Sequence, residues 1–146
     1  GDTMTNLQSP LVLLGRLMLA LIFVVEGWGK LTHYAETAQY MANFGVSRAL
    51  LPFVILVEFG GGILVAIGFL TRGAALALAA FCLLTAFIFH TQFADPDQLV
   101  QFYKNVAIAG GFLTLAAFGA GSLSIDAWQG QRRTVAPHNP SMERRT

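Results

Sequence analysis

The sequence has little charge. Only 12% of its 146 residues are Asp, Glu, Lys or Arg, which is about half the share found in soluble domains. Apolar residues make up 55% of the chain and are gathered into long blocks. A soluble domain of this size would need a more charged surface, so the composition favours a membrane protein.

Cysteine is almost absent as well. The single residue, Cys82, cannot form an internal disulfide, and no C-x-x-C is present. This counts against a thiol–disulfide exchanger that works through its own cysteine pair. We interpret Cys82 as a small buried apolar residue. The net charge of +1 gives no indication of a nucleic-acid partner.

No basic residue precedes the first apolar block, where Asp2 is the only charge. A signal peptide would begin with a basic region followed by a short apolar core. Here the block continues past Val25. We therefore expect it to be retained as a helix.

Four blocks are long enough to cross a membrane, which takes about 20 mostly apolar residues. They run from Pro10 to Lys30, from Ala49 to Leu70, from Gly73 to Phe93 and from Phe102 to Leu123. The predicted fold is an all-α membrane protein, a bundle of four transmembrane helices. We divide the chain into an N-terminal tail (1–9), the four-helix domain (10–129) and a polar, disordered cytoplasmic tail (130–146).

The connections between these blocks differ in character. Thr71-Arg72-Gly73 is predicted to be a tight turn that makes the second and third helices antiparallel neighbours, and 94–101 is predicted to be a loop. The 33–48 stretch is longer and amphipathic. Gly45 is expected to end a short helix there, and Ser47 to cap the second span.

The aromatic content of this amphipathic stretch predicts that it lies along the membrane surface. Tyr34, Tyr40, Met41 and Phe44 have no other evident place to bury.

Lysine and arginine are distributed unevenly between the two ends of the predicted bundle. Four spans put both termini on one side, and Lys and Arg accumulate on the cytoplasmic side. The side of the termini carries Arg16, Arg72, Arg132, Arg133, Arg144 and Arg145, and the other side carries Lys30, Arg48 and Lys104. We predict a multi-pass protein of a bacterial inner membrane with both termini in the cytoplasm.

Glycines occur inside two of the spans, at 60–62 and at 110–111. In lipid, small residues let helix backbones approach closely. The glycines predict a packing seam between helices, with a glycine-lined cofactor slot as the alternative.

Six polar residues are expected to meet in one layer near the periplasmic ends of the helices. They are Glu26, Lys30, Glu58, His90, Lys104 and Asn105. Glu26 and Lys30 form an (i, i+4) pair, on a face of the first helix that should look into the bundle.

Glu58 most needs a partner, because a charge at the bilayer centre costs roughly 2.5–3.5 kcal/mol. We expect that partner to be Lys104, with Asn105 as a second donor. The layer is either a binding or proton-handling site or a set of structural polar contacts. Apart from His33, no histidine is a candidate partner for His90 at its depth, which counts against haem.

Several segments with a characteristic order and spacing cover most of the chain. They are R-L-M-L-A-L-I-F from Arg16, E-G-W-G-K ending at Lys30, E-F-G-G-G-I-L-V-A-I-G-F-L-T-R from Glu58 to Arg72, His90, K-N-V-A-I-A-G-G-F-L from Lys104 to Leu113, and G-A-G-S-L-S-I-D ending at Asp126. From about Leu11 to Asp126 the chain resembles the DoxX family of small bacterial membrane proteins. The resemblance implies a four-helix inner-membrane protein. Members are commonly labelled oxidoreductases, after relatives of the small subunits of a thiosulfate:quinone oxidoreductase.

Three functions remain open at this point, and whether the chain is an enzyme is undecided. The first is a redox-associated membrane subunit whose polar layer holds a quinone head group. The second is a non-catalytic accessory or assembly subunit of a larger membrane complex. The third, less favoured, is a small proton-coupled transporter. The expected partners are the lipid bilayer and either other membrane subunits or further copies of the chain.

Overall fold

The computed structural model describes residues 2–134, and side chains from residue 6 to residue 133. This part of the chain is helical and contains no strand. The elements are α1 (Asp2–Thr32), α2 (Tyr34–Asn43), η1 (Arg48–Leu50), α3 (Leu51–Ile55), η2 (Leu56–Gly60), α4 (Gly61–Ile67), α5 (Thr71–Phe89), α6 (Pro96–Phe118) and α7 (Ile125–Thr134).

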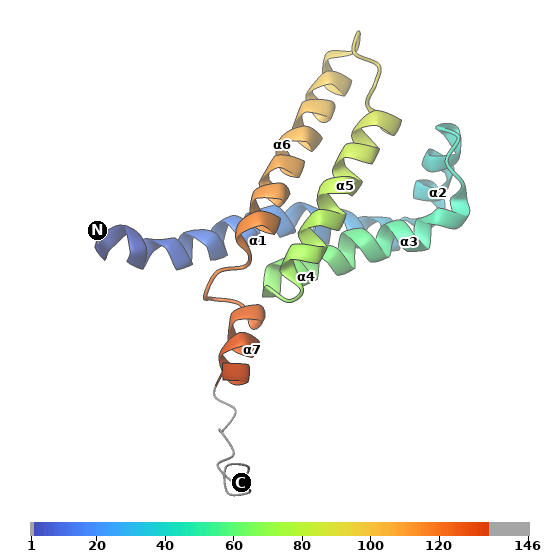
Figure 1. Cartoon of the computed structure of the whole chain (residues 1–146). Coiled ribbons are helices and arrows are strands. Elements are labelled where there is room, and N and C mark those ends of the chain that lie inside the picture. Colours follow the sequence, from blue (N-terminus) through green and yellow to red (C-terminus); the bar gives the residue numbers. More distant parts are fainter. Residues whose placement is uncertain (1, 135–146) are drawn as a thin grey trace, which may run out of the picture.

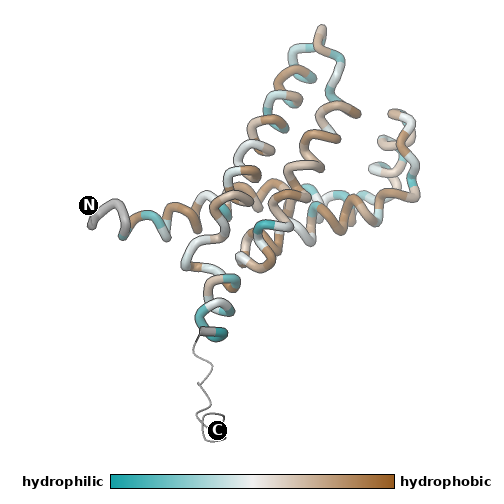
Figure 2. Tube along the Cα trace, in the orientation of Figure 1, coloured by the Kyte–Doolittle hydropathy of each residue, from teal (hydrophilic) through white to brown (hydrophobic). Residues whose placement is uncertain are grey.

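Four segments are long and apolar enough to cross a membrane. They are Asn6–Thr32, Arg48–Ile67, Thr71–Phe89 and Pro96–Phe118. Figure 2 shows apolar residues along these spans and hydrophilic ones gathered in α7. The predicted all-α membrane protein with four spans is therefore confirmed.

The spans form two helical hairpins that cross one another (Figure 1). In the first, α1 runs beside the continuous helical segment from η1 to α4, and in the second α5 runs beside α6. The hairpins pack at their crossing, where Phe23 of α1 and Phe112 of α6 meet edge to face with ring centroids 5.3 Å apart. Away from the crossing the hairpins diverge. We call the end with residues 33–50 and 90–95 the open end, and the end with residues 66–72 and 119–126 the closed end.

Glycines set the closest contacts between the first two spans, at Gly62 within the predicted seam and at Gly27, which was not among the predicted positions. A Cβ atom on Gly27 would lie 2.7 Å from the Cβ of Phe59 and 2.8 Å from its backbone nitrogen. A Cβ on Gly62 would lie 3.2 Å from the nitrogen of Val24. The first two spans therefore approach backbone to backbone, which only the absence of a side chain permits.

The turn between α4 and α5 lies at 68–70, not at the predicted 71–73. Gly68 adopts φ +71°, and Phe69 donates its N–H to the carbonyl of Leu64 while Gly68 donates to Val65. This is the Schellman pattern that ends a helix at a glycine. Thr71 is already the first residue of α5.

Other predicted boundaries also shift. α1 begins at Asp2 and continues through Pro10, where the first span was expected to start. α6 begins at Pro96, inside the predicted 94–101 loop, because the Asp95 carboxylate accepts from the N–H of Asp97 and proline suits the first helical position. Of the tail predicted to be disordered, 130–134 belong to α7 and 135–146 lie outside the described residues.

The short helix between the first two spans forms as predicted. α2 ends just before Gly45, which has φ +74°, and the Ser47 hydroxyl accepts from the N–H of Ala49. The expectation that Met41 has no place to bury is wrong, since it is only 4% exposed and packs with Ala38 and Leu51. Whether α2 lies at a membrane surface stays a prediction.

Candidate functional site

A cavity of about 680 Å³ occupies the open end, between the two diverging hairpins. Its lining includes all six residues of the predicted polar layer: Glu26, Lys30, Glu58, His90, Lys104 and Asn105. Three of these residues come from the first hairpin and three from the second, so polar groups face the cavity from both sides. The remaining wall is mainly aromatic and aliphatic, with Phe53, Phe81 and Phe89 among its members.

Lys30 is the centre of the charged group on the first hairpin. Its Nζ lies 2.9 Å from Oε2 of Glu58 and 3.4 Å from Oε2 of Glu26. Glu58 is buried, with 5% of its surface exposed, whereas the Glu26 side chain is 60% exposed. The tight approach at Gly27, nearly one turn before Lys30, places the ammonium against the second span.

This pairing corrects the expected partner of Glu58. The sequence predicted Lys104, but Lys104 is exposed on α6, and in the described residues only Lys30 forms ion pairs. Depth alone suggested Lys104, because both residues were expected at the same level of the bilayer. The pairing depends on which helices are neighbours, and the first two spans are in backbone contact.

Glu58 also lies in a π-helical turn, Leu56–Gly60, that interrupts the second span. A π-helical turn has i→i+5 hydrogen bonds and shifts the side chains that follow it around the helix axis. Such turns are rare and are frequently found at functional sites. In the sequence, Glu58 was identified because it is a carboxylate in an otherwise apolar segment. The sequence contained no signal for the π-helical turn itself.

The second hairpin presents a hydrogen-bonded set of imidazole, amide and hydroxyl groups. His90 Nδ1 lies 2.8 Å from Oε1 of Gln98, across the end of the α5–α6 hairpin. The Asn105 amide nitrogen donates to the carbonyl of Gln101 at 2.9 Å, and its oxygen lies 3.4 Å from the Thr85 hydroxyl. Asn105 therefore interacts within its own hairpin, and the expectation that it donates to Glu58 is wrong.

Sequence reasoning missed several polar residues of the cavity. They are Thr37, Tyr40, Thr85, Gln98 and Gln101. Neutral polar residues near helix ends are common, so the sequence contained no specific signal for them. Tyr40 reaches the cavity by stacking on Phe89, with ring centroids 5.7 Å apart.

The closed end is held together by a different polar group, which includes Arg16. Arg16 is 2% exposed, and its guanidinium donates to the carbonyls of Ala66, Ala120 and Leu123. It thereby satisfies one carbonyl at the C-terminal end of α4 and two in the connection between α6 and α7. We interpret Arg16 as structural, because its two terminal guanidinium nitrogens donate to backbone carbonyls.

Asp126 completes this closed-end group. Its carboxylate accepts from the N–H of Leu70 at 2.9 Å and of Thr71 at 3.0 Å, which caps the start of α5. Burial opposes the ionised carboxylate, but these donors and the nearby Arg16 outweigh it and hold the pKa of Asp126 below its usual value. The two family-like segments at Arg16 and Asp126 therefore meet at one helix junction.

Chemically, the open-end cavity offers separated hydrogen-bonding groups around an apolar space. One side has an ammonium shared by two carboxylates, and the other has an imidazole, amides and a second ammonium. Its volume lies within the range of about 300–1,000 Å³ typical of small-molecule sites. Such a lining can orient a flat apolar ligand that carries polar atoms at opposite edges.

Comparison with known proteins identifies one matching family and two similar inner membrane proteins. The DoxX family model matches residues 11–91. The inner membrane protein YqjF of Escherichia coli (strain K12) is 50% identical over 123 residues, which cover 84% of this chain and 95% of that protein. The inner membrane protein YphA of the same organism is 38% identical over 126 residues, covering 82% of this chain and 90% of that protein. No solved structure matches the chain at a significant level.

Proposed function

Because the chain belongs to the DoxX family of integral inner membrane proteins, we propose that it is a redox-associated membrane subunit that binds a quinone head group in the open-end cavity. The observation that carries the proposal is that six polar residues, supplied by both hairpins, line one cavity with aromatic walls.

The chemistry of a quinone suits this lining. A quinone is a planar ring with a carbonyl acceptor at each of two opposite edges and an apolar tail. Lys30 on the first hairpin and Lys104 on the second provide donors on opposite sides of the cavity. Aromatic side chains such as Phe53 and Phe89 can pack against the ring. The spaces between apolar helices can hold the tail.

The two lysines would play different parts. Lys30 is engaged by Glu26 and Glu58, so its position is constrained before any ligand arrives. Lys104 forms no ion pair among the described residues and is free to turn toward a carbonyl. His90, whose Nδ1 faces Gln98, has its second ring nitrogen available for a ligand.

The test is a binding measurement on the purified protein. After purification in mild detergent, bound quinone is extracted and quantified, and a short-tailed quinone is titrated into the quinone-free protein. We expect close to one quinone per chain, and an affinity loss of about tenfold for Lys104→Met, equivalent to one charge-assisted hydrogen bond of roughly 1.5 kcal/mol. Thr114→Val is the control, since Thr114 is exposed on α6 outside the cavity. Equal binding by both variants would indicate simple partitioning into detergent and contradict the proposal.

A second candidate is an accessory subunit of a larger membrane complex. It is favoured by the divergence of the hairpins toward the open end (Figure 1), together with the large apolar side chains that remain exposed on them. Phe53 is 64% exposed and Phe87 63% exposed. A stable membrane partner that co-purifies while no quinone is extracted would favour this function over the first.

A further inference from the structure

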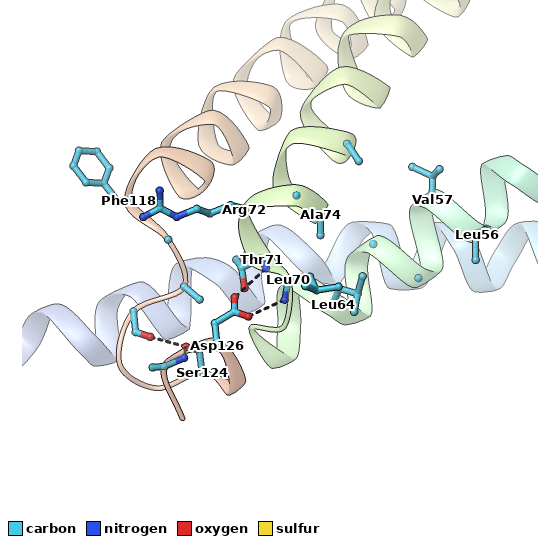
Figure 3. Close-up of a pocket in the computed structure, with 18 residues that line it drawn as sticks. Leu56, Val57, Leu64, Leu70, Thr71, Arg72, Ala74, Phe118, Ser124 and Asp126 are labelled. Atoms are coloured by element: carbon cyan, nitrogen blue, oxygen red, sulfur yellow. Dashed lines mark hydrogen bonds between the residues drawn. The ribbon is translucent and has the colours of Figure 1, made fainter. Parts of the chain in front are cut away.

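A second large groove lies at the other end of the molecule, separate from the candidate site. It has a volume of about 920 Å³ and extends from Leu56 on the second span to the closed end (Figure 3). Small residues of α4 and α5 line it, among them Gly61, Ala74 and Ala77. Since these positions belong to two of the four spans, this part of the groove lies at a depth where lipid tails surround the protein.

One cation lies at the closed end of this mostly apolar groove, where Thr71 and Asp126 also line it. Arg72 is exposed, and its side chain extends toward Phe118 (Figure 3). Arg72 forms no ion pair with any described residue. The nearby carboxylate of Asp126 is directed instead at the N–H groups of Leu70 and Thr71. The guanidinium is therefore left without a counter-ion.

We propose that this groove binds one anionic phospholipid, with its phosphate on Arg72 and one acyl chain along the small residues of α4 and α5. A cation at the end of a span meets the phosphate layer of the bilayer, and basic pockets between transmembrane helices bind anionic head groups. The small side chains leave a channel that an acyl chain fills by apolar contact alone. The phosphate of the lipid thus pairs with the charge of Arg72, and its acyl chain fits the apolar part of the groove.

Charge argues against a second copy of the chain as the occupant. The closed end carries Arg16 and Arg72, and α7 adds Arg132 and Arg133. A parallel copy would bring the same cations to the same level. An anionic lipid instead supplies the opposite charge.

Native mass spectrometry of the detergent-purified protein tests the proposal with two defined lipids, dioleoyl-phosphatidylglycerol and dioleoyl-phosphatidylcholine. We expect wild type to retain the anionic lipid preferentially. Arg72→Gln should lose about fivefold in affinity for it, which corresponds to the roughly 1 kcal/mol that one Lys or Arg contributes near an anionic surface. Arg133→Gln, with the same loss of charge outside the groove, should retain wild-type affinity.

A second pair of variants tests the acyl-chain channel. Ala77→Phe fills the groove and should weaken binding of both lipids, whereas Ala80→Phe on the same helix lies outside the groove and should not. Equal lipid retention by Arg72→Gln and Arg133→Gln would overturn the proposal. So would thermal stabilisation by inorganic phosphate equal to that by the lipid, or a homodimer that Ala77→Phe dissociates in the absence of bound lipid.

Discussion

The contact between Lys30 and Glu58 can be tested by a double-mutant cycle. The perturbations are Lys30→Met, Glu58→Gln and the double variant, which remove the cation, the anion or both. At the observed 2.9 Å, an effective dielectric constant of about 20 gives an attraction of roughly 5–6 kcal/mol. Desolvation of the buried Glu58 carboxylate and the half-buried Lys30 ammonium offsets most of this attraction. A net coupling of about 1–2 kcal/mol is therefore expected, at the upper end of values measured between membrane helices.

The assay is equilibrium unfolding of the purified protein in mixed detergent micelles with increasing SDS, followed by tryptophan fluorescence. Lys30→Met alone should cost more than the double variant, since it leaves the buried Glu58 carboxylate without compensation. Glu26→Gln should cost only about 0.2–0.5 kcal/mol, because Glu26 is mostly exposed and forms an ordinary (i, i+4) pair with Lys30.

A matched cycle of Glu58→Gln with Lys104→Met serves as the control. These two changes should add within about 0.5 kcal/mol, as expected for residues that share no contact. Coupling of Glu58 to Lys104 but not to Lys30 would refute the reasoning, and with it the packing of the first two spans.

Three further predictions follow from other parts of the structure. Gly27→Ala should destabilise the protein by about 1–3 kcal/mol, because its Cβ would clash with the backbone of the neighbouring span, whereas Gly29→Ala, which meets nothing within 4 Å, should not destabilise it; equal unfolding curves would contradict the close approach. The pKa of Asp126 is lowered in the folded state, so its stabilising contribution should be complete above about pH 4 and be lost as the pH falls through the folded-state pKa. Asp126→Asn should lack that acid-dependent loss of stability in melting scans between pH 3 and 7. At neutral pH it should lower the stability by about 1 kcal/mol, because the cap of α5 is weakened. If the variant kept the acid-dependent loss, another group would be responsible for it. With the native cysteine replaced, a cysteine at Ala94 should react with an impermeant thiol reagent on intact cells and one at Gly130 should not, as expected if both termini are cytoplasmic; the opposite labelling would reverse the orientation.

Much of the fold could be predicted because its strongest constraints are local. A bilayer requires about 20 apolar residues per span and internal satisfaction of each backbone polar group, and the four blocks follow from this. The errors in the predicted fold were at helix boundaries, where short-range capping interactions outweighed the hydropathy of the segment. Asp95 with Pro96 starts α6 in what was predicted to be a loop, and Gly68 ends α4 before the predicted turn.

The candidate site was partly accessible from the sequence. Glu58, Lys30 and His90 were identified because charged or titratable groups are costly in a membrane and so stand out. Thr85, Gln98 and Gln101 were not identified, because neutral polar residues at helix ends carry no such cost. The predicted partner of Glu58 was wrong, because hydropathy indicates the depth of a residue in the bilayer. It does not indicate how the helix is rotated or which helices are its neighbours.

The sequence by itself determined that the chain is helical, that four of its segments are long and apolar enough to cross a membrane, and which ionisable groups those segments carry. These properties follow from the solvation of each segment taken alone. Only the tertiary structure decided that Lys30 pairs with Glu58, that the hairpins cross and diverge to leave a cavity, and that Arg16 and Asp126 join helix ends far apart in the chain. These contacts depend on the close approach at Gly27 and on side-chain packing at the crossing, which involve residues from separate spans and have no signature within any one of them.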